Sequence, residues 1–105
     1  MTPEEVIEQI RLRIARAVPA ASRVVLFGSR ARESADSASD HGVLVIEPEV
    51  NDPAGEAVRL RGELADVLAP IDVVVVDWAL ARRRAAVRGT LVERALREGR
   101  VLADT

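Results

Sequence analysis

The sequence predicts an α/β domain in which a small mixed sheet has helices packed against it in two layers. Short apolar, β-branched runs alternate along the chain with segments of helical periodicity. The first two such runs are only about a dozen residues apart, which leaves parallel and antiparallel pairing both open. At 105 residues the chain has room for one hydrophobic core. We therefore expect a single domain over residues 1–105.

Local signals give the bounds of the predicted elements. A capping box with proline at the first helical position opens the chain at Thr2, and a second capping box begins at Thr90. Gly99 is expected to end the last helix. The predicted order is a helix over 2–18, a strand over 23–27, a helical turn over 29–32, a strand over 43–46, a helix over 55–68, a strand over 71–76, and helices over 78–88 and 90–98.

Composition excludes several classes of protein. The net charge of −2 argues against a nonspecific nucleic-acid binder, which usually carries a surplus of positive charge. The absence of cysteine excludes disulfides, thiol chemistry and zinc–thiolate sites. Apolar residues make up 49% of the chain, yet no apolar run approaches the ~18 residues of a membrane span, and the N-terminus does not resemble a signal peptide. We expect a cytoplasmic protein.

A turn after the first predicted strand is suited to binding phosphate. Gly28 permits a tight turn and lets a phosphate approach the backbone N–H groups. Ser29 follows at the start of the predicted helical turn, where free N–H groups favour an anion, and Arg30 and Arg32 add positive charge. A Gly-Ser pair alone is more often a plain turn, so this interpretation depends on the residues that follow.

Two carboxylates lie on the next two strands. Asp40 stands at the start of the second strand, where residues 40 and 42 share a face, and paired carboxylates at this spacing can hold magnesium ions. Position 42 is glycine and offers no ligand. Asp72 interrupts an otherwise apolar strand, which is costly unless the carboxylate is paired, metal-bound or at an edge. A solvated or arginine-paired Asp72 and a metal ligand are both open.

Three nearby residues are expected to have structural roles. His41 should point away from the carboxylate face, and an exposed side chain is favoured for it. Asp77 is expected to cap the helix that begins at Trp78, and Trp78 to anchor that helix rather than to stack on a base. The arginines at 82–84 and 88 fit a solvated helix face better than a docking patch.

Together these residues carry a family resemblance. Gly28-Ser29, ten further residues and Asp40-His41-Gly42 resemble the Gly-Ser…Asp-x-Asp signature of the DNA polymerase beta-like nucleotidyltransferase superfamily. The chain is most similar to its minimal nucleotidyltransferases, which are small bacterial proteins, and the similarity extends to Ile71-Asp72-Val73 and to residues 98–102. The resemblance implies the nucleotidyltransferase fold, with a small mixed sheet and helices packed against it.

The resemblance also implies an activity and a partner. Such proteins transfer a nucleotidyl group, AMP from ATP, with Mg²⁺, and often act as the antitoxin of a small helical HEPN-type toxin. It assigns nucleotide binding to Gly28, Ser29, Arg30 and Arg32, and metal binding and catalysis to Asp40 and Asp72.

This sequence departs from the family pattern at two positions. Glu33 stands where glycine is usual, and Gly42 stands where the second metal-binding aspartate is expected. Loss of that carboxylate should lower the rate about a thousandfold or more. Three hypotheses follow: a weakly active transferase, an impaired relative that still binds nucleotide, and an antitoxin-like module that neutralises a helical toxin by complex formation. The acceptor and the oligomeric state, including self-association, stay open.

Overall fold

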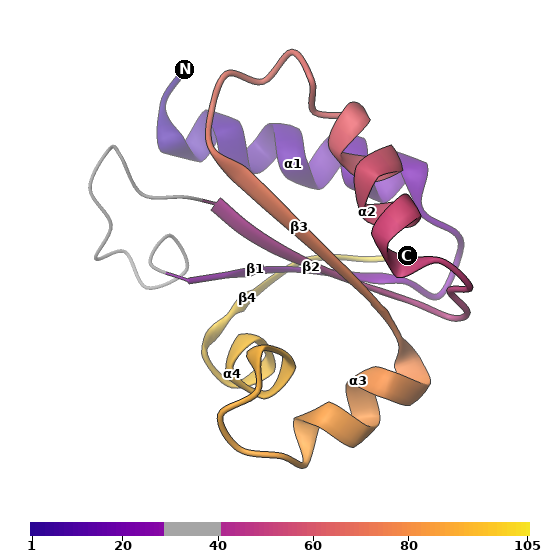
Figure 1. The fold of residues 1–105 in the computed structure, drawn as a ribbon. Helices are drawn as coiled ribbons and strands as arrows, with labels where there is room; N and C mark the ends of the chain where they lie inside the picture. Colours follow the sequence, from indigo (N-terminus) through magenta and orange to yellow (C-terminus); the bar gives the residue numbers. More distant parts are fainter. Residues whose placement is uncertain (29–40) are drawn as a thin grey trace.

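A computed structural model describes residues 1–28 and 41–105. The predicted helical turn over 29–32 and the site residues Ser29, Arg30, Arg32 and Asp40 lie outside the described residues. The described elements, shown in Figure 1, are α1 (Pro3–Ala17), β1 (Arg23–Phe27), β2 (His41–Glu47), α2 (Pro53–Gly62), β3 (Ile71–Asp77), α3 (Trp78–Ala85), α4 (Leu91–Glu98) and β4 (Arg100–Asp104).

The four strands form one mixed sheet in the order β3-β2-β1-β4. β1 pairs with β2 and with β4 in antiparallel fashion, whereas β2 and β3 are parallel. The parallel pair is joined through α2, as a parallel crossover requires. The predicted mixed α+β architecture is confirmed.

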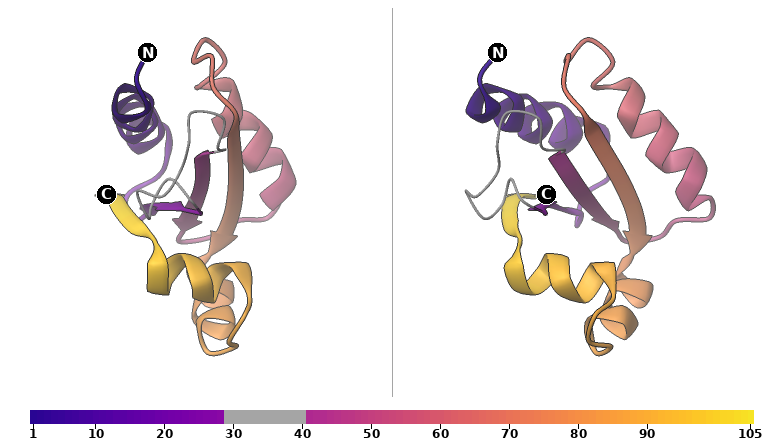
Figure 2. Two further views of the ribbon diagram at one scale, coloured as in Figure 1. Left: turned by 90° about the vertical axis from the view of Figure 1, so that its left-hand side faces the viewer. Right: turned by 60° about the vertical axis from the view of Figure 1, so that its left-hand side comes forward.

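Helices cover both faces of this sheet, which differs from the two layers expected. α1 and α2 lie on one side and α3 and α4 on the other, and both views in Figure 2 show the same separation. The two faces have separate cores, because strand residues alternate between them. One core joins Val43 and Val45 to Ile10 and Leu60 of the first two helices, and the other joins Leu44 to helices α3 and α4.

The predicted caps at three helix starts are present. Thr2 Oγ1 accepts from the Glu5 N–H at 3.2 Å, and Glu5 returns the bond to the Thr2 N–H, which completes the capping box. Asp77 accepts from the Leu80 N–H at 2.8 Å at the start of α3. Thr90 caps α4 through the Glu93 N–H. These side chains satisfy backbone donors that a helix leaves without intrahelical partners.

Four expectations about the elements were wrong. Residues 100–104 form β4, for which no strand was predicted, and α2 ends at Gly62 rather than at 68. Leu68 is consequently 96% exposed instead of lying on the apolar side of a helix. His41 does point away from the face of Gly42, but it is 1% exposed because it packs against Pro70, whose carbonyl oxygen lies 3.4 Å from His41 Nδ1.

Across 1–28 and 41–105 no helix has the length and apolar character needed to span a membrane.

Candidate functional site

The strand register brings two predicted site positions, 42 and 72, into one row across the sheet together with Phe27. Gly42 of β2 is paired with Asp72 of β3 on one side and with Phe27 of β1 on the other. Directly paired residues point to the same face, which here is the face covered further along by α3 and α4. Asp72 is exposed at this position. A side chain at position 42 would therefore stand between Phe27 and the Asp72 carboxylate.

The space beside Gly42 is filled by an aromatic ring. A Cβ atom at position 42 would lie 2.8 Å from two carbons of the Phe27 ring, which is closer than carbon atoms approach one another. The half-buried ring thus covers the point from which the expected second carboxylate would project. Any larger residue at 42 requires the Phe27 ring to turn away.

The described residues do not supply a complete magnesium site. Mg²⁺ takes oxygen ligands, and a two-metal site needs several carboxylates facing one another. Within 1–28 and 41–105, no group of three acidic or histidine side chains is arranged to hold a metal. Asp72 is the predicted ligand that the structure describes, and the register position next to it carries no ligand. Asp40, the other predicted ligand, lies outside the described residues.

The turn at the end of β1 begins with the left-handed backbone that only glycine adopts easily. Gly28 has φ 83°, and no atom lies within 4 Å of the place where its Cβ would be. Among the described residues, nothing crowds the backbone at this turn, and its phosphate-binding role stays a prediction. The other predicted nucleotide-binding residues, Ser29, Arg30 and Arg32, lie outside the described residues.

A hollow of about 380 Å³ adjoins this glycine. It is lined by Phe27, Gly28, Gly89, Leu91, Arg94, Ala95 and Glu98. Sequence reasoning missed the α4 residues among them, since they belong to no motif and meet β1 only through folding. Gly99 explains how α4 reaches β1: a Cβ there would lie 2.7 Å from Cγ1 of Val25, so only glycine permits this close approach.

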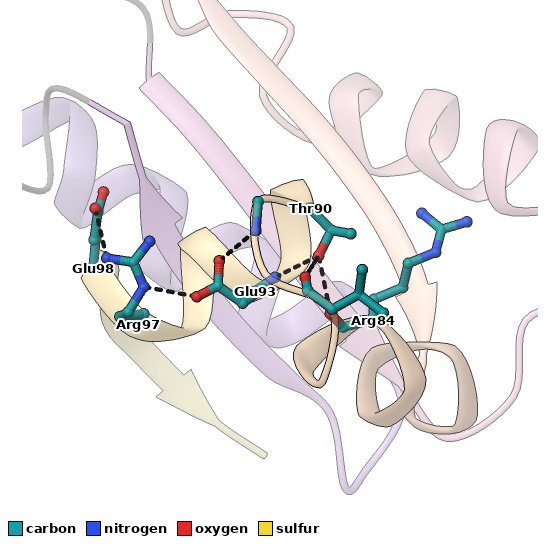
Figure 3. Close-up of polar contacts among 7 residues, drawn as sticks. Arg84, Thr90, Glu93, Arg97 and Glu98 are labelled. Carbon is teal, nitrogen blue, oxygen red and sulfur yellow. Dashed lines mark hydrogen bonds and ion pairs between the residues drawn. The ribbon is translucent and has the colours of Figure 1, made fainter.

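Polar side chains on α4 hold the start of this helix in a fixed arrangement (Figure 3). Glu93 accepts from the Gly89 N–H at 3.1 Å and from Arg97 Nε at 2.7 Å. Arg97 also donates to Glu98 at 3.1 Å, and Thr90 Oγ1 donates to the carbonyl of Arg84 at 2.9 Å. The Arg97 hydrogen bond lowers the pKa of Glu93, with the Gly89 N–H as a second cause. These hydrogen bonds fix the start of α4, which forms one wall of the hollow.

Comparison with known proteins identifies the family. A family model described as "Nucleotidyltransferase domain" matches residues 7–102. The chain belongs to the nucleotidyltransferase domain family. The matched range includes both strands of the Gly42–Asp72 row and the whole of α4. A comparison with curated proteins gave no significant match.

Solved structures share this nucleotidyltransferase fold. A toxin–antitoxin complex with AMP-PNP contains a chain with TM-score 0.62 and 20% identity, over 100% of this chain and 75% of that one. A chain of a mutant toxin–antitoxin complex MntA–HpeT gives TM-score 0.59 and 19% identity over the same shares. The complex of a tri-AMPylated Shewanella oneidensis HEPN toxin with its MNT antitoxin gives 0.61 and 17%, over 99% and 74%. At these identities the likeness concerns the fold.

A second polar cluster lies at the opposite end of β2. Glu47 ends that strand, is 4% exposed, and packs against Glu56 of α2. Burial, together with the neighbouring Glu56 carboxyl, raises the pKa of Glu47 to about 7. Arg59 holds Glu56 through bonds of 2.7 and 2.8 Å, which lowers the pKa of Glu56 to about 2. The two neighbouring carboxyl groups thus have pKa values shifted in opposite directions.

Proposed function

We propose that this protein transfers AMP from ATP to a partner protein in a magnesium-dependent reaction, at a rate lowered by the glycine at position 42. The observation that carries the proposal is the row of Phe27, Gly42 and Asp72 in a chain of the nucleotidyltransferase domain family. The row keeps one family carboxylate and replaces its neighbour by a glycine under an aromatic ring.

Each predicted site residue has a role in this proposal. Gly28 and Ser29 would hold the phosphates at the turn after β1, and Arg30 and Arg32 would offset their negative charge. Asp40 and Asp72 would hold magnesium, which neutralises phosphate oxygens and aligns them for attack. The open backbone at Gly28 and the exposed carboxylate at Asp72 support these roles. The set lacks a ligand at 42, so a low rate follows.

The proposed acceptor is a small helical protein of the HEPN type. Support comes from the structures that share the fold, which are described as toxin–antitoxin complexes, one with AMP-PNP and one with an AMPylated HEPN toxin. In the reaction, an acceptor group on the partner forms a bond to the α-phosphorus of ATP while the bond to pyrophosphate breaks.

Transfer of label from α-labelled ATP tests this function. The chain is incubated with Mg²⁺ and candidate HEPN-type proteins, and each candidate is analysed for added AMP. We expect slow labelling that stops when magnesium is chelated and when Asp40→Ala is introduced. Labelling that continues in Asp40→Ala would reject the assigned site, and no labelling at any enzyme concentration would reject transfer by this chain.

A binding module is the second candidate, and the Phe27 ring favours it. The ring packs against Gly42 as an ordinary core contact would, which suits a protein whose catalytic row is no longer used. In this case the chain neutralises its toxin by covering it, without any chemistry. A toxin that is inhibited equally well by the unmodified chain and by Asp40→Ala, in the absence of ATP, would favour this function.

A further inference from the structure

We propose that Arg94 of α4 binds the phosphate tail of the nucleotide in the hollow beside Gly28. This inference rests on the proposed function, since it concerns the nucleotide that the Gly28 turn would hold. It adds Arg94, from the C-terminal part of the chain, to the proposed nucleotide-binding residues, which lie at the end of β1 and in the segment that follows it.

The hollow offers one cation and an open approach. Arg94 is the basic residue among its seven lining residues, and Gly28 and Gly89 leave open space at two points of its wall. Both positions have left-handed backbone, φ 83° and 91°, which favours glycine. Because glycine has no side chain, neither residue obstructs a ligand there. A volume of about 380 Å³ can hold a chain of phosphate groups.

Arg94 is also uncommitted, unlike Arg97 of the same helix. Arg97 is bound to Glu93 and Glu98. The exposed Arg94 guanidinium has no hydrogen bond or ion pair in the described part of the chain. A guanidinium free of internal partners, held on a well-ordered helix, can bind phosphate oxygens in bidentate fashion.

Charge in the hollow favours the tail of the nucleotide over its nucleoside part. Glu98 lies in the same hollow, but its carboxylate accepts from Arg97 at 3.1 Å, so part of its charge is already offset. The phosphate tail carries several negative charges and adenosine carries none. The Arg94 contribution should thus depend on how many phosphates the ligand has.

Binding measured by calorimetry with three ligands tests the assignment. The ligands are ATP, inorganic tripolyphosphate and adenosine, each titrated at one fixed salt concentration into the full chain. Arg94→Gln removes the cation, and Arg83→Gln is the matched control because Arg83 is an exposed arginine of α3 outside the hollow. We expect Arg94→Gln to weaken ATP and tripolyphosphate about tenfold, as for a charged hydrogen bond, and to leave adenosine unchanged. Arg94→Lys, which keeps the charge, should retain part of the affinity.

The remaining outcomes separate this inference from the proposed function. ATP affinity that is equal in Arg94→Gln and Arg83→Gln would overturn the inference and leave nucleotide binding intact. An equal loss for ATP and adenosine in Arg94→Gln would place the residue at the nucleoside and overturn the tail assignment. Failure of the unmodified chain to bind ATP or tripolyphosphate would overturn both the inference and the proposed use of ATP. If Arg94→Gln does not fold, the comparison of Arg94→Lys with Arg83→Lys decides.

Discussion

At its N-terminal end β2 carries a glycine covered by an aromatic ring, whereas at its C-terminal end it carries a buried carboxyl group packed against another one. Gly42 is paired with Asp72 at the position where we predict a second metal-binding aspartate, and Glu47 lies outside the predicted site. Asp72 beside Gly42 is exposed, while the pKa of the buried Glu47 is raised to about 7 by burial and by the neighbouring Glu56. The two ends of the sheet thus accommodate a carboxyl group in two ways: Asp72 is exposed to water, whereas Glu47 is buried beside a partner that helps to raise its pKa.

The difference also shows that acidic residues alone do not locate a catalytic site. The C-terminal end of β2 is rich in carboxylates, which line a hollow of about 430 Å³ with Arg59. There Arg59 binds Glu56, and burial raises the pKa of Glu47 to about 7. The N-terminal end has fewer carboxylates but presents Asp72 to solvent next to the family motif. Substitutions at positions 42, 47, 29 and 72 test this comparison, with the largest expected effect first.

The largest expected effect comes from giving position 42 a carboxylate. Gly42→Asp should raise AMP transfer to the partner by at least about a hundredfold, roughly 2.7 kcal/mol in barrier, because the new carboxylate would stand beside Asp72. The Phe27 ring must move to admit it, so Phe27→Leu in the same background should increase the gain. Label incorporated from α-labelled ATP measures both.

Two controls accompany the position 42 experiment. Gly42→Ala introduces the Cβ without the carboxylate and should give no gain, which separates the charge from the displaced ring. Asp40→Ala should abolish the gain of Gly42→Asp. A folded Gly42→Asp protein that stays inert with its true partner would leave binding of the toxin as the better account of function.

The next effect concerns the pH dependence of stability. The folded chain holds the Glu47 proton more tightly than the unfolded chain, since the pKa rises from 4.5 to about 7 on folding. The free energy of unfolding should consequently fall as pH rises from 4.5 to about 7 and then level off. Glu47→Gln has no proton to lose, so the fall should shrink by on the order of 1–3 kcal/mol. Urea unfolding at pH 5 and pH 8 measures it.

Exposed Glu49 provides the matched control for Glu47, because Glu49→Gln removes a nearby carboxylate without removing the buried one. Glu56 acts in the opposite direction: its pKa is lowered to about 2, so its contribution is lost as pH falls below 4.5. Equal pH slopes in the unmodified chain and in Glu47→Gln would show that folding does not raise the pKa of Glu47.

A smaller effect is expected at the turn after Gly28. Ser29→Ala removes a hydroxyl that we expect to bind a phosphate oxygen and should weaken ATP about tenfold, as for a hydrogen bond to a charged group. Calorimetry measures the loss, and Ser37→Ala, which removes a hydroxyl outside the predicted phosphate-binding turn, is the control. If ATP affinity is the same in Ser29→Ala and Ser37→Ala, the turn has no phosphate-binding role.

The smallest effect is a change in stability at Asp72. Because this carboxylate is exposed and has no partner among the described residues, Asp72→Asn should change the free energy of unfolding by less than about 0.5 kcal/mol. In the Gly42→Asp background the same substitution should abolish the regained transfer. A marked loss of stability in Asp72→Asn would give this aspartate a structural role instead of a catalytic one.

Local signals predicted most of the fold. The strand over 23–27 has the predicted bounds, and the caps at Thr2, Asp77 and Thr90 are present, because these features depend on neighbours in sequence. β4 could not be predicted in this way. Its five residues are charged at both ends and carry no β-branched run, and they become a strand by pairing with the free side of β1.

The site was predictable in its motif but not in its contacts. The pattern around Gly28 and Gly42 indicated the correct family, whereas the loss of a metal ligand at position 42 stays a prediction. That the Phe27 ring fills the place beside Gly42 depends on strand register, which the sequence left open between parallel and antiparallel pairing. The contribution of Arg94 to the hollow and the pairing of Glu47 with Glu56 depend on tertiary packing in the same way.

The position of β1 inside the sheet has a consequence for the order of folding. One neighbour of β1 is β2, but the other is β4, and Arg23 bonds Asp104 across 81 residues at 2.6 Å. The Thr105 N–H further donates to the Ser22 carbonyl at 2.8 Å. Closing so long a loop costs chain entropy that no local contact offsets in advance. During synthesis β1 must wait for residues 100–105, so one side of the strand stays open until the ribosome has made them.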